Sequence, residues 1–101
     1  MVVASFLITG MVKEMIEVKQ IDESKFEVIL EEGRTKTKHI VTLDKSYYEK
    51  LTKGKITKKE LIERSFEFLL DREPKESILS RFNLKVITTY FPEYEQKIRI
   101  E

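Results

Sequence analysis

Apolar and polar residues alternate with a period of two over the first part of the chain. The alternation covers three segments: Met11–Gln20, Lys25–Glu31 and Thr35–Leu43. In the second segment Phe26, Val28 and Leu30 share one face, and Ile29 interrupts the polar face. This pattern is typical of strands with one buried and one solvent-facing side. We therefore predict three antiparallel strands, and leave a fourth strand open.

The residues between these segments are suited to tight turns. Asp22-Glu23-Ser24 has short polar side chains that bond their own backbone, and Glu32-Gly33 ends in a residue that tolerates positive φ. A two-residue turn at Glu32-Gly33 predicts three facing pairs: Glu31 with Arg34, Glu27 with Lys38, and Phe26 with His39.

The period changes from two to that of a helix at Asp44, which is a good N-cap residue. A first helix runs from there to Gly54, which favours a helix end. Thr57 and Glu60 have the spacing of a capping box, which predicts a second helix from there to about Arg72.

Proline and asparagine residues mark the ends of predicted elements in the C-terminal third of the chain. Pro74 fits the first turn of a third helix that continues through residues 77–82. A short fourth helix over Leu84–Tyr90 and a last turn from Pro92 to Ile98 follow. Strands first and helices afterwards indicate an α+β domain, in which three to five short helices pack on one face of a β-meander.

The first twelve residues are apolar apart from Ser5, Thr9 and Gly10. The run lacks the basic start of a secretory signal and is too short for a membrane span. We assign residues 1–10 to an extension or an extra strand and residues 11–101 to the single domain. A buried strand, an oligomer arm, a loose tail and a native start at Met11 all stay open for this segment.

The composition limits the kinds of chemical site that the chain can form. The 101 residues contain no cysteine, which excludes disulfides, thiolate catalysis and cysteine zinc sites and favours the cytoplasm. Charged residues make up 37% and amides are few, which indicates a heat-adapted host. We expect no membrane association.

Positive charge is concentrated in the middle of the chain. Residues 34–59 hold nine basic and two acidic side chains, although the whole chain has a net charge of only +1. Such a segment can bind nucleic acid or another polyanion. The candidate contacts are Lys45, Lys50, Lys53, Lys55, Lys58 and Lys59, and Tyr47 and Tyr48 lie where they could stack on bases.

Catalytic, metal and cofactor signatures are missing from the sequence. His39 is the one histidine, and its alternation with Val41 predicts a sheet position rather than a catalytic one. Glu60, Glu63 and Glu67 fit an ion-paired helix face better than a cation site. We therefore predict a non-enzymatic domain without a cofactor.

A second candidate surface is aromatic. Tyr90, Phe91 and Tyr94 surround Pro92 and form either the end of the core or a patch for a protein partner. The sequence favours a protein-interaction or assembly module, with a homo-oligomer or a protein partner. Nucleic-acid binding through Lys45–Lys59 is the alternative.

The stretch from Arg64 to Leu84, with Tyr90-Phe-Pro-Glu-Tyr after it, resembles a family of small uncharacterised proteins from bacteria and archaea. The resemblance covers roughly residues 12–98. It implies a stand-alone domain of unknown function and transfers no functional residue.

Overall fold

The first three strands form the antiparallel meander that the alternation predicts. The computed structural model describes residues 14–100, and these strands are β1 (Glu14–Asp22), β2 (Lys25–Glu32) and β3 (Thr35–Thr42). The β1–β2 turn is closed by Asp22, whose Oδ1 accepts a hydrogen bond from the Ser24 N–H at 2.9 Å. The predicted extension of residues 1–10 lies outside the described residues.

The pairing of β2 with β3 differs from the predicted register. The two-residue turn begins at Gly33 rather than Glu32, and Gly33 has the positive φ, 62°, that favours glycine. As a result Val28, and not Phe26, lies opposite His39. The shift amounts to two residues in the pairing, so each side chain keeps its predicted face and His39 stays buried.

Two helices follow the meander, α2 (Lys45–Thr52) and α3 (Lys58–Leu70). Between them Lys53 and Gly54 have φ values of 54° and 74°, which reverse the chain where the helix end was predicted. The predicted capping box is confirmed at the start of α3. Thr57 Oγ1 accepts from the Glu60 N–H at 3.0 Å, and Glu60 Oε1 accepts from the Thr57 N–H at 2.9 Å.

The prediction of a helix over residues 77–82 is wrong. The chain forms a single 3-10 turn, η1 (Lys75–Ser77), and then a short strand, β4 (Arg81–Asn83), which pairs parallel to β3. The Ile40 N–H of β3 donates to the Ser80 carbonyl at 2.8 Å. Pairing satisfies backbone groups along this edge of β3, and it outweighs the helical spacing of Ile78 and Phe82.

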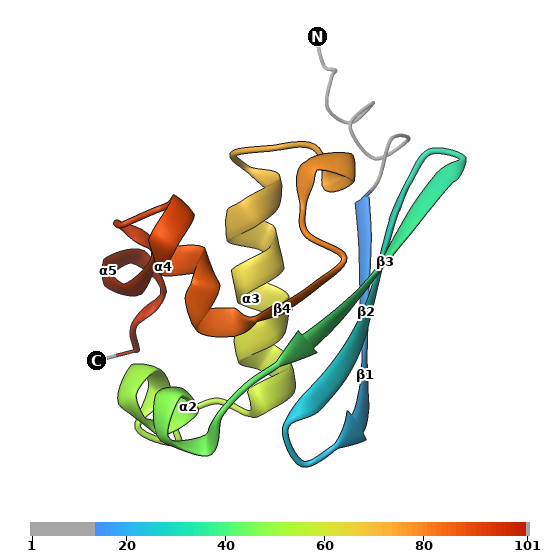
Figure 1. The fold of residues 1–101 in the computed structure, drawn as a ribbon. Coiled ribbons are helices and arrows are strands. Elements are labelled where there is room, and N and C mark those ends of the chain that lie inside the picture. The colour runs from blue at the N-terminus through green and yellow to red at the C-terminus, as the bar shows by residue number, and fades with distance from the viewer. Residues whose placement is uncertain (1–13, 101) are drawn as a thin grey trace, which may run out of the picture.

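Short helical elements complete the C-terminal part, close to the predicted positions. They are the 3-10 turn η2 (Leu84–Val86), α4 (Ile87–Tyr90) and α5 (Tyr94–Ile98). Beyond α5 the Ile100 N–H donates to the Leu51 carbonyl at 2.9 Å, which attaches the end of the described chain to α2. The four-stranded sheet has the order β1-β2-β3-β4, and the helices gather on one side of it (Figure 1). The fold is α+β, as predicted.

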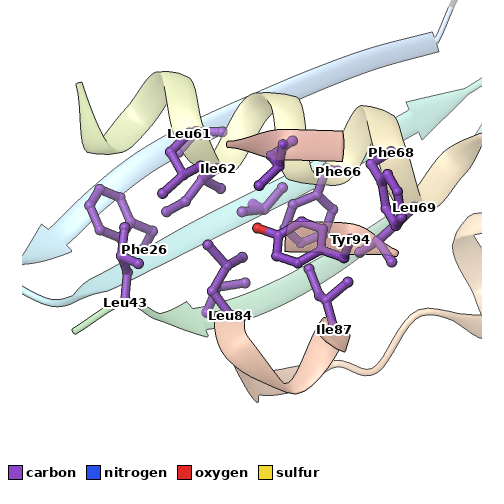
Figure 2. Close-up of a cluster of buried hydrophobic side chains, with 14 of the residues drawn as sticks. Phe26, Leu43, Leu61, Ile62, Phe66, Phe68, Leu69, Leu84, Ile87 and Tyr94 are labelled. Carbon is purple, nitrogen blue, oxygen red and sulfur yellow. The ribbon is translucent and has the colours of Figure 1, made fainter. Parts of the chain in front are cut away.

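The hydrophobic core lies between the inner face of the sheet and this helical layer. Side chains from the strands, from α3 and from the C-terminal helices meet in one cluster (Figure 2). Phe26, Phe66 and Tyr94 are the largest of its fully buried members. The C-terminal end of α3 and the segment 77–91 lie next to each other beside this core.

Candidate functional site

An apolar groove of about 260 Å³ opens between the C-terminal end of α3 and the segment 77–91. Leu69 of α3, Ile78 and Phe82 form part of its wall, and most other lining residues are also apolar. Glu73 is the one charged residue among those that line it. The groove therefore offers an apolar surface with a single carboxylate at its margin.

Two large apolar side chains of the groove are exposed. Leu79 is 45% exposed and Tyr90 is 62% exposed, and both line the groove. Within residues 14–100, Met15 and Ile21 are the other exposed large apolar residues. Exposed apolar side chains beside a concave apolar surface are typical of sites that contact other molecules.

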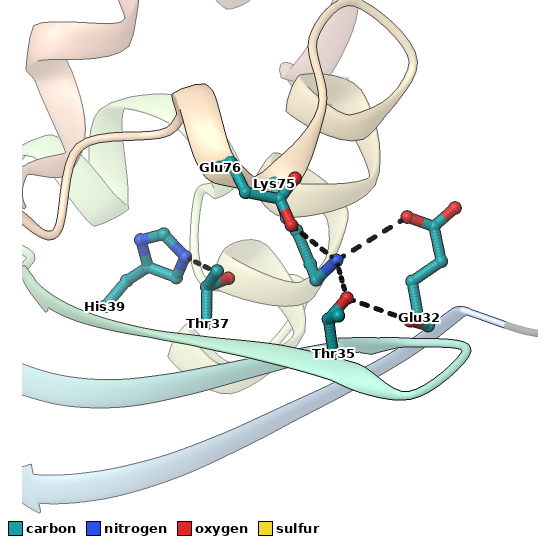
Figure 3. Close-up of polar contacts among 6 residues, drawn as sticks. All are labelled: Glu32, Thr35, Thr37, His39, Lys75 and Glu76. Atoms are coloured by element: carbon teal, nitrogen blue, oxygen red, sulfur yellow. Dashed lines mark hydrogen bonds and ion pairs between the residues drawn. The ribbon is translucent and has the colours of Figure 1, made fainter.

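His39 holds one wall of this groove in place. Its Nδ1 lies 2.7 Å from the carbonyl oxygen of Leu79. Its Nε2 lies 2.8 Å from the hydroxyl of Thr37 (Figure 3). A carbonyl only accepts, so Nδ1 carries the hydrogen and Nε2 accepts from Thr37. Burial lowers the pKa of His39, against the opposing effect of the Leu79 hydrogen bond. The ring is neutral at pH 7 and has no free nitrogen for proton transfer.

A buried lysine attaches the same wall to the β2–β3 hairpin. Lys75 is 3% exposed, and its Nζ donates to Thr35 Oγ1 and to Glu76 Oε2 at 2.8 Å (Figure 3). Glu32 Oε1 lies 3.8 Å from the same nitrogen. The hydrogen bond from Lys75 lowers the pKa of Glu76. Sequence reasoning missed Lys75, because a lysine among charged residues normally indicates a solvated surface.

The lysines that were predicted to contact nucleic acid lie in different environments in the structure. Lys50 forms an ion pair with Glu95 at 3.4 Å. Lys58 donates to the Glu23 carbonyl at 3.0 Å, and its Nζ lies 5.9 Å from the centre of the Tyr48 ring. These two lysines therefore have structural contacts within the domain.

Lys45, Lys53, Lys55 and Lys59 are exposed. Within residues 14–100, the side chains of Lys45, Lys53 and Lys59 have no ion pair or hydrogen bond. Tyr47 is buried, so it is not available to stack on a base. The basic surface therefore consists of lysines on α2 and around the α2–α3 turn, without the aromatic contribution of Tyr47.

Tyr47 takes part in a polar cluster that joins α2 to the C-terminal helices. Its hydroxyl donates to Glu95 Oε2 at 2.8 Å and lies 3.4 Å from the hydroxyl of Thr88. Burial raises the pKa of Tyr47 to about 12, and the bond from Tyr47 lowers the pKa of Glu95. These contacts join α2 to α5 and hold the Glu95 carboxylate between Tyr47 and Lys50.

The predicted aromatic patch does not hold together as one surface. Tyr94 is fully buried, and its hydroxyl lies 2.6 Å from Ser65 Oγ, so this residue cannot contact a partner. The local phase of α5 turns Tyr94 inward. Phe91 is partly buried, edge-on to Phe68 with ring centres 5.9 Å apart, whereas Tyr90 is exposed. What remains of the patch is one margin of the groove.

Metal binding and membrane spanning find no support in the part of the chain that the structure describes. No group of three or more histidine or acidic side chains among residues 14–100 is placed to hold a metal ion. Glu60 is engaged in the capping box, apart from any such group. Among the same residues, no helix is long and apolar enough to cross a bilayer.

Comparison with known proteins adds no identity. No protein-family model, no curated protein and no solved structure matches the chain.

Proposed function

We propose that this domain is a non-enzymatic interaction module that binds a short apolar segment of a partner protein in the groove. The observation that carries the proposal is the position of Leu79 and Tyr90, which are exposed at the margin of an apolar cavity. Burial of such side chains against a partner is favourable by about 25 cal/mol per Å² of apolar area.

The size of the groove favours side chains of a peptide over a small-molecule substrate. Pockets that enclose drug-sized ligands span roughly 300–1,000 Å³. At about 260 Å³, this groove fits one or two large apolar side chains of a longer segment. The remainder of such a segment would lie over Leu79 and Tyr90 at the surface.

Contacts within the domain hold the walls of the groove in place. His39 and Lys75 attach the segment 75–79 to β3 and to the β2–β3 hairpin, and the Ile40–Ser80 backbone bond fixes the residue that follows. A groove that needs little ordering on binding loses less conformational entropy. This favours a dedicated recognition surface.

The charge of the groove favours a basic residue in the partner segment. Glu73 is only partly exposed, and its carboxylate has no ion pair or hydrogen bond within residues 14–100. A lysine or arginine beside the apolar anchors of the partner would satisfy it. We therefore expect a segment with one or two large apolar residues and a basic residue nearby.

The same geometry gives no support to catalysis. A general base and a nucleophile must lie within hydrogen-bond reach of each other, usually in a cleft. Both His39 nitrogens are occupied by hydrogen bonds, and Glu73 has no nucleophile bonded to it among the described residues.

Selection of a displayed library of 12-residue peptides on the intact chain tests the proposal. We expect enriched peptides with paired large apolar residues and a lysine or arginine. Their affinity, measured by fluorescence polarisation, should fall about tenfold or more for Leu79→Asp. It should fall less for Glu73→Gln, and only for peptides that contain the basic residue.

The chain offers a matched control for this experiment. Met15 is 54% exposed, close to Leu79 at 45%, but lies on β1 away from the groove. Met15→Asp should leave peptide affinity unchanged. Enriched peptides without apolar residues, or equal affinity for wild type and Leu79→Asp, would contradict the proposal.

Nucleic-acid binding is a second candidate, favoured by the exposed lysines Lys45, Lys53 and Lys59. The fluorescence anisotropy of labelled DNA and RNA should rise as the protein is added, and the affinity should be lower at moderate than at low salt. The triple change of these lysines to Gln should abolish it. A control that removes equal charge elsewhere changes three other exposed lysines: Lys36, Lys85 and Lys97. Absence of binding at low salt would reject this candidate.

A further inference from the structure

The outer edge of β1 is the longest unpaired strand edge in the described part of the chain. β1 comprises nine residues, Glu14–Asp22, and lies at the end of the order β1-β2-β3-β4. Within residues 14–100, β2 is its one partner strand. Figure 1 shows this edge on the side of the sheet away from β4. An open edge carries a row of backbone groups that can pair with another strand.

The backbone hydrogen bonds and strand registers establish which backbone groups point outward. The Ile40 N–H bonds the Ser80 carbonyl, so Ile40 faces β4 and its neighbour Val41 faces β2. Val41 pairs with Phe26, so the backbone groups of Phe26 face β3. Those of the next residue, Glu27, therefore face β1.

The same alternation continues across β1. Glu27 pairs with Lys19, so the backbone N–H and C=O of Lys19 point into the sheet. The groups of Ile16, Val18 and Gln20 therefore point away from the sheet, at the free edge. The ladder is regular up to Gln20, because the register shift lies between Gln20 and Asp22.

The side chains of β1 are complementary to a second, antiparallel copy of the same strand. When the two copies are centred on Val18, Ile16 of each lies opposite Gln20 of the other, and all outward backbone groups are paired. On the outer face, Glu17 of each copy then lies opposite Lys19 of the other. The register thus makes two opposite-charge pairs, one on each side of the axis.

This register also accounts for two exposed apolar side chains. Met15 is 54% exposed and Ile21 is 51% exposed, and among residues 14–100 they are the exposed large apolar residues that lie outside the groove. Centred on Val18, Met15 of one copy lies opposite Ile21 of the other.

We propose that two copies of this chain pair through β1 in antiparallel register centred on Val18, which joins their sheets into one of eight strands. The interface is isologous, because each copy contributes the same strand. None of the residues that line the groove belongs to β1, so the groove is not part of this interface. The dimer therefore presents two grooves for the partner segments proposed above.

Charge reversal tests this register in the full-length chain by sedimentation velocity. Glu17→Lys puts lysines 17 and 19 opposite each other, and Lys19→Glu puts glutamates there. We expect each single variant to raise the dimer Kd about tenfold or more. The double variant restores opposite charges, and an equimolar mixture of the two single variants should form a heterodimer. Lys36→Glu on β3 makes the same charge change as Lys19→Glu, but away from β1, and should leave the dimer Kd unchanged.

Amide hydrogen exchange gives a second readout that does not depend on substitutions. In the dimer the amides of Ile16, Val18 and Gln20 should gain protection as protein concentration rises. Those of Glu17 and Lys19, which already bond β2, should be protected at every concentration.

Three results would overturn the proposal. The first is a monomer at all concentrations. The second is an association that neither single variant weakens. The third is concentration-independent protection of Ile16, Val18 and Gln20 in a monomer, which would mean that residues 1–13 cover the edge. Far-UV circular dichroism of each variant shows that a lost dimer is not a lost fold.

Discussion

The Nδ1 atom of His39 donates a hydrogen bond of 2.7 Å to the carbonyl oxygen of Leu79, forty residues further along the chain. The contact joins β3 to the exposed wall of the groove. The imidazole is buried, and its ring centre lies 5.6 Å from that of Phe66. His39 is a residue type that can act in acid–base chemistry, but in this fold it helps to shape the groove.

Burial of His39 predicts that the domain loses stability in mild acid. Its pKa in the folded state lies below 6.5, because burial disfavours the charged ring. The unfolded chain therefore binds the proton first, and the free energy of unfolding falls as pH drops below 6.5. Urea unfolding at pH 7.5, 6.5 and 5.5 should show this decrease.

His39→Gln provides the control for the pH experiment, since the chain has one histidine. The variant should be less stable at pH 7.5, and its stability should depend less on pH over this interval. Three glutamates with lowered pKa, Glu76, Glu93 and Glu95, lose their favourable contacts only below pH 4.5. An unchanged pH dependence in His39→Gln would contradict the assignment.

Lys75 should contribute more through its buried side-chain carbons than through its charge. Lys75→Ala removes the buried hydrocarbon stem and should cost about 2–4 kcal/mol. Lys75→Met keeps most of the stem and loses the hydrogen bonds, at about 1 kcal/mol. Its acidic partners Glu32 and Glu76 are 44% and 61% exposed, so neither becomes a buried unpaired charge. Equal losses of unfolding free energy in the two variants, measured by urea unfolding, would contradict the larger contribution of the side-chain carbons.

Local patterns were sufficient to predict most of the fold. Alternation identified the strands and their buried faces, and Thr57 with Glu60 identified the start of α3. The ion pair predicted between Glu27 and Lys38 forms at 3.2 Å, although the register places Ile40 opposite Glu27. The long lysine side chain reaches diagonally, so this ion pair is compatible with either register.

Features that depend on distant segments could not be read from the sequence. β4 exists because β3 offers an edge to residues forty positions away, whereas Ile78 and Phe82 have helical spacing. The groove is formed by segments that carry no motif. Tyr90 and Tyr94 look equivalent in the sequence, yet Tyr90 is exposed and Tyr94 is buried.

Lys53 adopts the left-handed conformation, which is unfavourable for a residue with a Cβ atom. Lys53→Gly should therefore stabilise the domain by about 0.5–1 kcal/mol, after the greater flexibility of glycine in the unfolded chain is subtracted. Lys53→Gln removes the same charge and keeps the strain, so its melting temperature should stay close to that of the wild type. Equal stabilisation by both variants would assign the effect to charge repulsion instead.

The buried pair Ser65 and Tyr94 predicts an asymmetric response to substitution. The Ser65 hydroxyl donates to the Leu61 carbonyl at 2.7 Å, so the Tyr94 hydroxyl is the donor in the 2.6 Å bond between the two side chains. Tyr94→Phe removes that donor and leaves Ser65 bonded to Leu61, at a cost of about 1 kcal/mol. Ser65→Ala leaves the Tyr94 hydroxyl buried without an acceptor, at a cost of about 1–3 kcal/mol.

A double-mutant cycle measures this asymmetry directly. The double variant has no unsatisfied hydroxyl, so it should be more stable than the sum of the two single losses implies. Urea unfolding of the four proteins gives the coupling energy, which we expect to be about 1 kcal/mol. Additive losses, or a larger loss for Tyr94→Phe than for Ser65→Ala, would contradict the direction of the hydrogen bond.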